Sequence, residues 1–426
     1  MSEDGLPEGW IAAALGDVAD VQLGKMLDRA KRIKGKHLPY LRNASVRWGG
    51  FDLSDLLTMP FESDELERYS VQRGDLLVCE GGEPGRAAVW EGGVSNIKYQ
   101  KAILRVRPGP AISDPRWIMY SLRHDALSGN LEQRFTGSTI KHFPRQAVLQ
   151  YEIRIPPLVE QKRIVAKLEE LLARVNAARE ALARVLAILK RFRQAVLAAA
   201  CEGRLTEAWR EEHRRDGDWP SVVLGSVVKD TSYGSASKSS VSGKVPVLRM
   251  GNIQDGRLDW DDLVYTSDPA EIKKYRLSAG DLLFNRTNSP ELVGKTAVYR
   301  GERDAIYAGY LIRVRCTDQL LPDYLNYCLN GPAGKEYLMQ VKTDGVSQSN
   351  INAKKLAAFE FGLPAVNEQE EIVRRVEALF KLADAIAKHV AAATARAERL
   401  TQAILAKAFR GELVPTEADL ARRGMI

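Results

Sequence analysis

The segment VEQKRIVAKLEELLARV, residues 159–175, returns later in the same chain as NEQEEIVRRVEALFKLA, residues 367–383. The Glu-Gln dipeptides at the start of the two copies are separated by 368 − 160 = 208 residues. The same offset relates QAVLAAACEGRL, residues 194–205, to QAILAKAFRGEL, residues 402–413. Solenoid repeats are much shorter, at about 20–50 residues. The long period therefore predicts a duplicated half-molecule.

The duplication also covers the sequence between the long segments, where the offset shifts by a residue or two. The matched pairs are PYLRNASV (39–46) with PVLRMGNI (246–253), RYSVQRGDLLV (68–78) with KYRLSAGDLLF (274–284), GRAAVW (85–90) with GKTAVY (294–299), and PRWIMYSL (115–122) with PDYLNYCL (322–329). DLLV and DLLF each follow a Gly and are typical of strands that leave a turn. Each half is therefore predicted to be an α/β (α+β) domain rich in sheet.

Apolar residues of both long segments recur in alternating steps of four and three, which is the period of a coiled-coil seam. The predicted seam positions are Ile164, Leu168, Leu171, Val175, Ala178, Leu182, Val185, Leu189, Phe192 and Val196 in the first helix, and Ile372, Val376, Leu379, Ala383, Ile386, Val390, Ala393, Ala397, Leu400 and Ile404 in the second. A separate surface helix is usually only about 10–14 residues long. We therefore expect the two long helices to pack together.

The direction of the helices follows from the chain between them. Each helix would be about 65 Å long, and a parallel pair would require the chain to return over that distance. We therefore expect an antiparallel coiled coil that separates two pseudo-symmetric, sheet-containing domains. The predicted division is 1–156 for the first domain, 157–205 for the first helix, 206–363 for a connector with the second domain, and 364–426 for the second helix and tail.

Composition sets broad limits. The chain has 426 residues, a net charge of +7 and four cysteines without a CxxC pair, which favours a reducing cytoplasm. No apolar run approaches the ~18 residues of a membrane span, and the polar, acidic start is unlike a signal peptide. A basic excess of this size permits an anionic partner without identifying one.

The helix openings IPPLVEQKRIV and LPAVNEQEEIV, with the endings QAVLAAACEGRL and QAILAKAFRGEL, resemble those of the DNA-specificity subunits of type I restriction–modification enzymes. The resemblance covers essentially the whole chain. It implies two target recognition domains, each reading half of a bipartite, asymmetric site in double-stranded DNA. It also implies helices that set the gap between the half-sites and bind two copies of the modification subunit.

The resemblance further implies a chain without catalytic activity or a cofactor of its own. The modification subunits would carry out adenine methylation with S-adenosylmethionine, and restriction subunits would use ATP and Mg²⁺. The sequence agrees with this division, because ELVGKT lacks the first Gly of a P-loop and the five histidines have no metal-ligand spacing. No metal site and no catalytic residue are therefore predicted.

DNA binding requires cations for phosphates and polar side chains for base edges. Predicted cations lie in the shared Leu-Arg and close to it on either side. They are Lys25, Arg29, Lys31, Arg32, Lys34, Lys36, Arg42 and Arg47 in the first half, and Lys238, Lys244 and Arg249 in the second. Those before the long helices are Ser138, Thr139, Lys141 and His142, and Ser347, Gln348, Ser349 and Asn350. FNRTNSP adds Asn285, Arg286 and Asn288.

Other interpretations stay open at this point. The charged runs could be solvated surface, and the Ser/Thr turns could cap the next element. For the whole chain, the alternatives are a self-sufficient DNA-modifying enzyme and a coiled-coil scaffold that does not bind nucleic acid. The lack of a cofactor or metal motif disfavours the first alternative. Failure to bind any duplex at any salt concentration, even with partner proteins present, would indicate the second.

Overall fold

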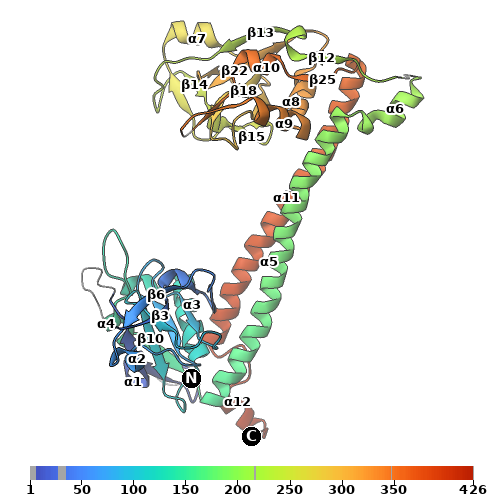
Figure 1. Cartoon of the computed structure of the whole chain (residues 1–426). Helices are drawn as coiled ribbons and strands as arrows, with labels where there is room; N and C mark the ends of the chain where they lie inside the picture. The colour runs from blue at the N-terminus through green and yellow to red at the C-terminus, as the bar shows by residue number, and fades with distance from the viewer. Residues whose placement is uncertain (1–5, 27–34, 215–216, 347, 426) are drawn as a thin grey trace. The chain divides into compact units, whose positions relative to one another are not determined.

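A computed structural model describes residues 6–26, 35–214, 217–346 and 348–425 (Figure 1). The chain forms two compact units, one from residues 1–182 with 392–426 and the other from residues 183–391. Two long helices, α5 (Leu158–Cys201) and α11 (Val366–Phe409), each pass from one unit to the other. We call the part of the first unit before α5 the first head, and the part of the second unit between α5 and α11 the second head.

The first head is built on a four-stranded antiparallel sheet of order β2-β10-β7-β8 and a three-stranded sheet of order β6-β3-β9. Its elements are β1 (Ile11–Ala14), α1 (Leu15–Val18), β2 (Ala19–Leu23), β3 (Lys36–Leu41), η1 (Asn43–Ser45), β4 (Val46–Arg47), β5 (Gly50–Phe51), β6 (Leu57–Phe61), α2 (Glu65–Arg68), β7 (Leu76–Cys79), β8 (Ala87–Val89), β9 (Lys98–Tyr99), β10 (Ile103–Pro108), α3 (Pro115–Ser128), η2 (Leu131–Arg134), α4 (Arg145–Leu149) and β11 (Glu152–Ile155). The C-terminal α12 (Glu417–Arg422) belongs to the same unit.

The second head repeats this arrangement, with a four-stranded sheet of order β13-β22-β18-β20 and a three-stranded sheet of order β17-β14-β21. Its elements, with the connector after α5, are η3 (Arg204–Thr206), α6 (Glu207–Glu212), β12 (Ser221–Val223), η4 (Leu224–Ser226), β13 (Val228–Tyr233), β14 (Val245–Leu248), η5 (Met250–Asn252), β15 (Ile253–Gln254), β16 (Arg257–Leu258), β17 (Val264–Thr266), α7 (Pro269–Tyr275), β18 (Leu282–Asn285), β19 (Thr287–Asn288), β20 (Thr296–Val298), β21 (Ile306–Tyr307), β22 (Leu311–Cys316), α8 (Pro322–Asn330), α9 (Pro332–Val341), β23 (Thr343–Asp344), β24 (Ser349–Asn350), α10 (Ala353–Ala357) and β25 (Glu360–Gly362). The predicted mixed α/β fold is confirmed.

The strands form where the sequence pattern predicts them. β7 and β18, which begin with the two leucines of the repeated Asp-Leu-Leu segments, are completely buried in the interior of their sheets. β10 pairs with both β2 and β7, and β22 pairs in the same way with β13 and β18. The two heads therefore share one scaffold, and differences between them lie outside it.

Within each unit the long helices pack in opposite directions. In the first unit, Leu168 and Val175 from the first half of α5 share a core with Ile404 and Ala408 from the last turns of α11. In the second unit, Val196 and Leu197 near the end of α5 share a core with the first turns of α11. The beginning of one helix thus lies beside the end of the other, which confirms the antiparallel prediction.

The predicted seam is wrong at several positions. Ala178 is exposed, the side chains of Ile386 and Leu400 are 38% and 49% exposed, and Thr401, next to Leu400, is buried instead. The hydroxyl of Thr401 donates to the carbonyl of Ala397 at 3.1 Å, so it can be buried without an unsatisfied group. Small residues also allow the two helix axes to approach closely. Packing therefore buries Thr401 in place of the predicted Leu400.

Leu171 and Leu379 also depart from the predicted seam. Both are partly buried, each against the core that includes its own head. The seam positions that the structure buries are Ile164, Leu168, Val175, Leu189, Val196, Ile372, Val376, Ala383, Val390, Ala397 and Ile404, while Leu182 is half-buried. None of the described helices is long and apolar enough to cross a membrane.

Candidate nucleic-acid interface

A short β-hairpin lies just before the long helix in each half. In the first head, Thr136 and His142 exchange backbone hydrogen bonds at 2.9 Å, and His142 also bridges to Gly81. In the second head, Asn350 of β24 pairs with Thr343 of β23 on one side and Thr287 of β19 on the other. We call residues 136–142 the first hairpin and residues 343–350 the second hairpin.

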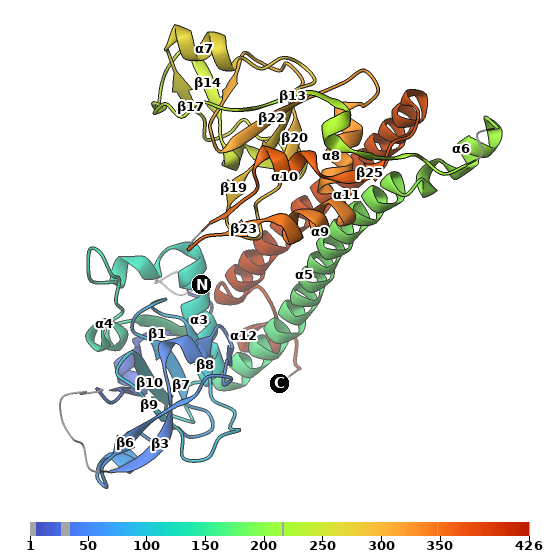
Figure 2. The ribbon, with the colours of Figure 1, turned by 45° about the horizontal axis from the view of Figure 1, so that its top comes forward.

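The second hairpin brings together two predicted DNA-binding segments that are about sixty residues apart in sequence. β19 and β24 join the segment that contains Arg286 and Asn288 to the segment that contains Ser349 and Asn350. Figure 2 shows β19 and β23 extending from the second head. The corresponding loop of the first head, around Gly81, is not among the segments predicted to bind DNA. It lies shortly before GRAAVW, as β19 lies shortly before GKTAVY, so the sequence repeat relates the two segments.

The tips of the hairpins are the most exposed parts. Ser138, Thr139 and Lys141 are exposed in the first hairpin, and Gln348 is exposed in the second. A Cβ on Gly137, at φ +90°, would lie 2.1 Å from the carbonyl oxygen of Ile140, so the turn requires glycine. Polar side chains on an exposed tip can reach a base edge.

Nearer the base of the second hairpin, the predicted residues hold the strands together. The Asn350 amide donates to the Thr287 hydroxyl at 2.7 Å, and its carbonyl oxygen accepts from Arg286 at 3.4 Å. Ser349 is buried and donates to Asp344, and bonds from Lys342 and then Ser349 lower the pKa of that carboxyl. Asn350, Ser349 and Arg286 therefore position the hairpin, whatever else they contact.

The remaining predicted residues of this region differ in exposure. The guanidinium of Arg286 lies over the Tyr233 ring at 4.7 Å. Asn285 is fully buried, and among the described residues its side-chain oxygen has no hydrogen-bond partner. Asn288 accepts from the backbone N–H of Ser289 at 2.8 Å. His142 of the first hairpin is exposed. Burial of Asn285 leaves it unable to reach a base unless the region rearranges.

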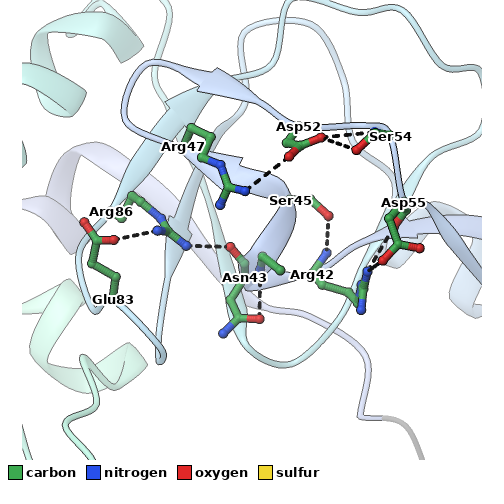
Figure 3. A network of polar contacts seen from close by, with 10 residues as sticks. Arg42, Asn43, Ser45, Arg47, Asp52, Ser54, Asp55, Glu83 and Arg86 are labelled. Carbon is green, nitrogen blue, oxygen red and sulfur yellow. Dashed lines mark hydrogen bonds and ion pairs between the residues drawn. The ribbon is translucent and has the colours of Figure 1, made fainter. Parts of the chain in front are cut away.

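A network of polar contacts surrounds the η1 turn of the first head (Figure 3). Arg42 forms an ion pair with Asp55 at 2.6 Å, and Arg47 forms one with Asp52 at 3.2 Å. In the second head, Arg249 forms the matching ion pair with Asp262 at 3.1 Å. Because both heads contain the same pair, Arg42 and Arg249 belong to the shared scaffold.

The same network reaches the first hairpin through residues that the sequence did not single out. The Asn43 amide donates to the carbonyl of Gly81 at 3.2 Å, and Gly81 bridges to His142. Arg86 donates to the carbonyl of Asn43 at 2.8 Å and pairs with Glu83. The η1 turn, the Gly81 loop and the first hairpin are therefore one connected surface.

The predicted cations have different environments. Lys25 is buried, forms an ion pair with Glu65 and donates to the carbonyl of Pro60 at 2.9 Å, so its role is structural and phosphate contact is not supported. Within the described part of the chain, the ammonium groups of Lys36, Lys141, Lys238 and Lys244 are exposed and have no carboxylate partner. Arg29, Lys31, Arg32, Lys34 and Ser347 lie outside the described residues.

Comparison with known proteins matches the family model "Type I restriction modification DNA specificity domain" twice, over residues 7–185 and 217–393. The chain belongs to this family. It is 32% identical to the EcoKI specificity subunit of Escherichia coli, over 97% of this chain and 91% of that protein. It is also 32% identical, with the same coverage, to the StySPI specificity subunit of Salmonella potsdam.

Solved structures agree on the fold of the specificity family. One chain, from a study of the assembly and conformational transition of a type I R-M system, has a TM-score of 0.74 and 22% identity over 96% of this chain and 99% of its own length. The HsdS subunit of Thermoanaerobacter tengcongensis has a TM-score of 0.53 and 22% identity over 96% of this chain and 98% of its own length. The two family matches in this chain correspond to the two repeated halves.

The described residues contain no group of three His, Cys, Asp or Glu side chains able to hold a metal ion. The four cysteines are free thiols. Burial raises the pKa of Cys79 to about 11 and that of Cys316 to about 12, which disfavours the reactive thiolate. The arrangement is suited to binding, with its polar groups on exposed tips and loops.

Apolar side chains are also exposed on the long helices. In the second unit, Leu186 and Ile188 of α5 are 48% and 52% exposed, and Leu382 of α11 is 56% exposed. Leu382 and Ile386 are four residues apart, so they lie on one face of the helix. Leu382 and Ile386 therefore form a small exposed apolar patch on α11.

Proposed function

We propose that this chain is the DNA-specificity subunit of a type I restriction–modification system and reads a bipartite, asymmetric site in double-stranded DNA. One observation supports this most directly. The two heads have the same sheets and the same hairpin position, yet the exposed tips carry Ser138, Thr139 and Lys141 in one head and Gln348 in the other. A shared scaffold with different tips is what two different half-sites require.

We further propose that the chain is not catalytic and has no cofactor of its own. Two modification subunits bind the helices, and the exposed Leu382 and Ile386 are the part of α11 that they cover in the second unit. These subunits methylate adenine with S-adenosylmethionine. Restriction subunits, which use ATP and Mg²⁺, complete the assembly.

The test is methylation by the assembled complex. The purified chain alone should transfer no methyl group to DNA. Together with its modification subunit and S-adenosylmethionine, it should direct methylation to one adenine in each half-site, mapped by single-molecule sequencing. Methyl transfer by the chain alone would identify a self-sufficient enzyme. A complex that methylates without sequence preference, or a chain that binds no duplex in the presence of its partners, would contradict the proposal.

A further inference from the structure

A groove in the second unit is lined by lysines from three elements. It lies between α5, α9 and the loop before β20, and encloses about 430 Å³. Lys190 of α5, Lys335 of α9 and Lys295 of the loop line it. We call these three residues with their surroundings the lysine groove. None of the three was among the residues predicted from sequence to contact DNA.

The lysines are not neutralised. Among the described residues, Lys342 next to the groove pairs with Asp344, but none of the ion pairs includes Lys190, Lys295 or Lys335. Lys335 donates to the side-chain oxygen of Gln194 at 2.9 Å, and Lys295 donates to that of Gln254 at 3.0 Å, so both bond only to neutral amides. The groove therefore has positive charge that is open to an anion.

The opposing charges nearby are few. Asp255 and Glu291 also line the groove but pair with none of the three lysines, and Arg193 is paired with Asp384 at 2.5 Å. Burial, followed by the positive charge of Lys190, lowers the pKa of Lys335, and Asp255 offsets only part of this. Like charges held this close repel each other, and an anion in the groove relieves the repulsion.

The fold does not require the charge of Lys190 or Lys335, whereas Lys295 corresponds to Arg86, which forms an ion pair with Glu83. By the 208-residue offset, Lys190 corresponds to Glu398 and Gln194 to Gln402 (398 − 190 = 402 − 194 = 208). By the offset of α3 and α8, 335 − 128 = 322 − 115 = 207, Lys335 corresponds to Ser128. The equivalent hollow of the first unit is lined by Ser128 and Gln402, encloses about 140 Å³ and contains no lysine. The same helix contacts therefore form without the positive charge.

Two elements that line the groove are connected along the chain to the second hairpin. α9 ends at Val341, two residues before β23 begins, and the loop that carries Lys295 starts directly after β19. Both elements that bring cations to the groove thus lead into the three-stranded sheet of the hairpin. Any duplex whose bases are read by that hairpin presents its phosphates to the adjoining surface.

We propose that the lysine groove binds the phosphate backbone of duplex DNA beside the half-site that the second head reads. The inference rests on the proposed function. It assigns these residues to sequence-independent affinity, because phosphates carry no base identity. It also predicts an asymmetry, since the first unit has Glu398 and Ser128 at the equivalent positions and gains no such contact.

The test compares two variants of the full chain, each assembled with the modification subunit. The first is Lys190→Gln with Lys335→Gln, which removes two exposed cations. The second is Lys229→Gln with Lys274→Gln, which changes the net charge equally at two residues outside the groove. The affinity of each complex for a duplex that contains its methylation target sequence is measured from 50 to 300 mM salt. The groove variant should lower the slope of log K against log[salt] by about 1.8, at about 0.9 per lost phosphate contact.

Phosphate ethylation interference locates the contact. In the groove variant, interference should disappear only beside the half-site of the second head, and the base preference should be unchanged. An unchanged salt slope in a complex that still binds its target would overturn the inference while leaving the proposed function intact. Loss of assembly in the absence of DNA would also overturn it, because the lysines would then bind an acidic surface of the partner. Failure of the unaltered complex to recognise any site would instead contradict the proposed function.

Discussion

At the scale of single residues, the Glu-Gln dipeptide that opens each long helix anchors the helix to its head. Glu160 is fully buried and accepts from Trp10 at 2.8 Å. Glu368, 2% exposed, accepts from Trp219 at 3.1 Å, from Thr206 at 2.8 Å and from Arg210 at 3.0 Å. The next residue is equivalent in both halves, since Gln161 and Gln369 each donate to a proline carbonyl at 2.8 Å. The Glu and Gln side chains are buried in both halves, and a buried polar side chain needs hydrogen-bond partners, which both halves supply at equivalent positions.

We expect Glu368→Ala to destabilise the second unit by about 3 kcal/mol, because it leaves the Arg210 guanidinium without its buried carboxylate. Glu370→Ala is the matched control, on the same helix turn but exposed, and should change stability by less than about 0.5 kcal/mol. Thermal unfolding of the full chain, followed by circular dichroism, distinguishes the two. Equal melting curves for both variants would show that the buried carboxylate is dispensable.

A second prediction separates base reading from support within one hairpin. Gln348→Ala at the exposed tip should relax base discrimination in one half-site by about 1–3 kcal/mol and leave stability unchanged. Asn350→Ala removes the bonds to Thr287 and Arg286, so it should lower the thermal stability of the second head as well. The measurements are methylation of a randomised target library and a melting curve. A stable Asn350→Ala protein with altered specificity, and no effect from Gln348→Ala, would reverse these roles.

At the scale of elements, the packing of α5 and α11 distinguishes two kinds of apolar residue that the sequence pattern treats alike. Val390 is 5% exposed, whereas Ile386, one turn earlier, is 38% exposed. A four-and-three pattern can be drawn through neighbouring positions of an alanine-rich helix. Only the approach of the second helix determines which of them face inward.

We expect Val390→Asp to separate the helix pair, because it places an unpaired charge in a buried seam at a cost of more than about 3 kcal/mol. Ile386→Asp should cost less than about 1 kcal/mol and instead weaken binding of the modification subunit. Unfolding curves and the affinity of the two purified proteins give both quantities. If Ile386→Asp left that affinity unchanged, the docking surface would have to lie elsewhere on the helices.

At the scale of the whole molecule, the repeat gives two heads joined through two helices of equal length. α5 and α11 begin 366 − 158 = 208 residues apart and end 409 − 201 = 208 residues apart. Both helices cross from one compact unit to the other, at residues 182–183 and 391–392. Two helices of equal length that connect the same two units are able to set the gap between the two DNA half-sites. This can be tested without altering either head.

Duplicating residues 176–182 in α5 and 385–391 in α11 adds one heptad to each helix at that crossing and keeps the seam in phase. The pair lengthens by ~10.5 Å at 1.5 Å per residue, which corresponds to about three base pairs of DNA. The half-sites should stay the same and the preferred gap between them should increase by about three base pairs. Methylation of a library with every gap length measures it. An unshifted optimum in a complex that assembles normally would mean that the helices only dock the partners.

The sequence by itself determined the duplication, the mixed α/β heads, the two long helices and their antiparallel direction. These follow from repeat spacing, hydrophobic period and chain length, which are properties of one segment or of its copy. The placement of Lys25, Asn285, Ile386 and Leu400 did not follow, because exposure depends on what packs against a residue from a distant part of the chain. Only the tertiary structure joined β19 to the second hairpin and placed Lys190 beside Lys335, since both arrangements bring together segments that are remote in sequence.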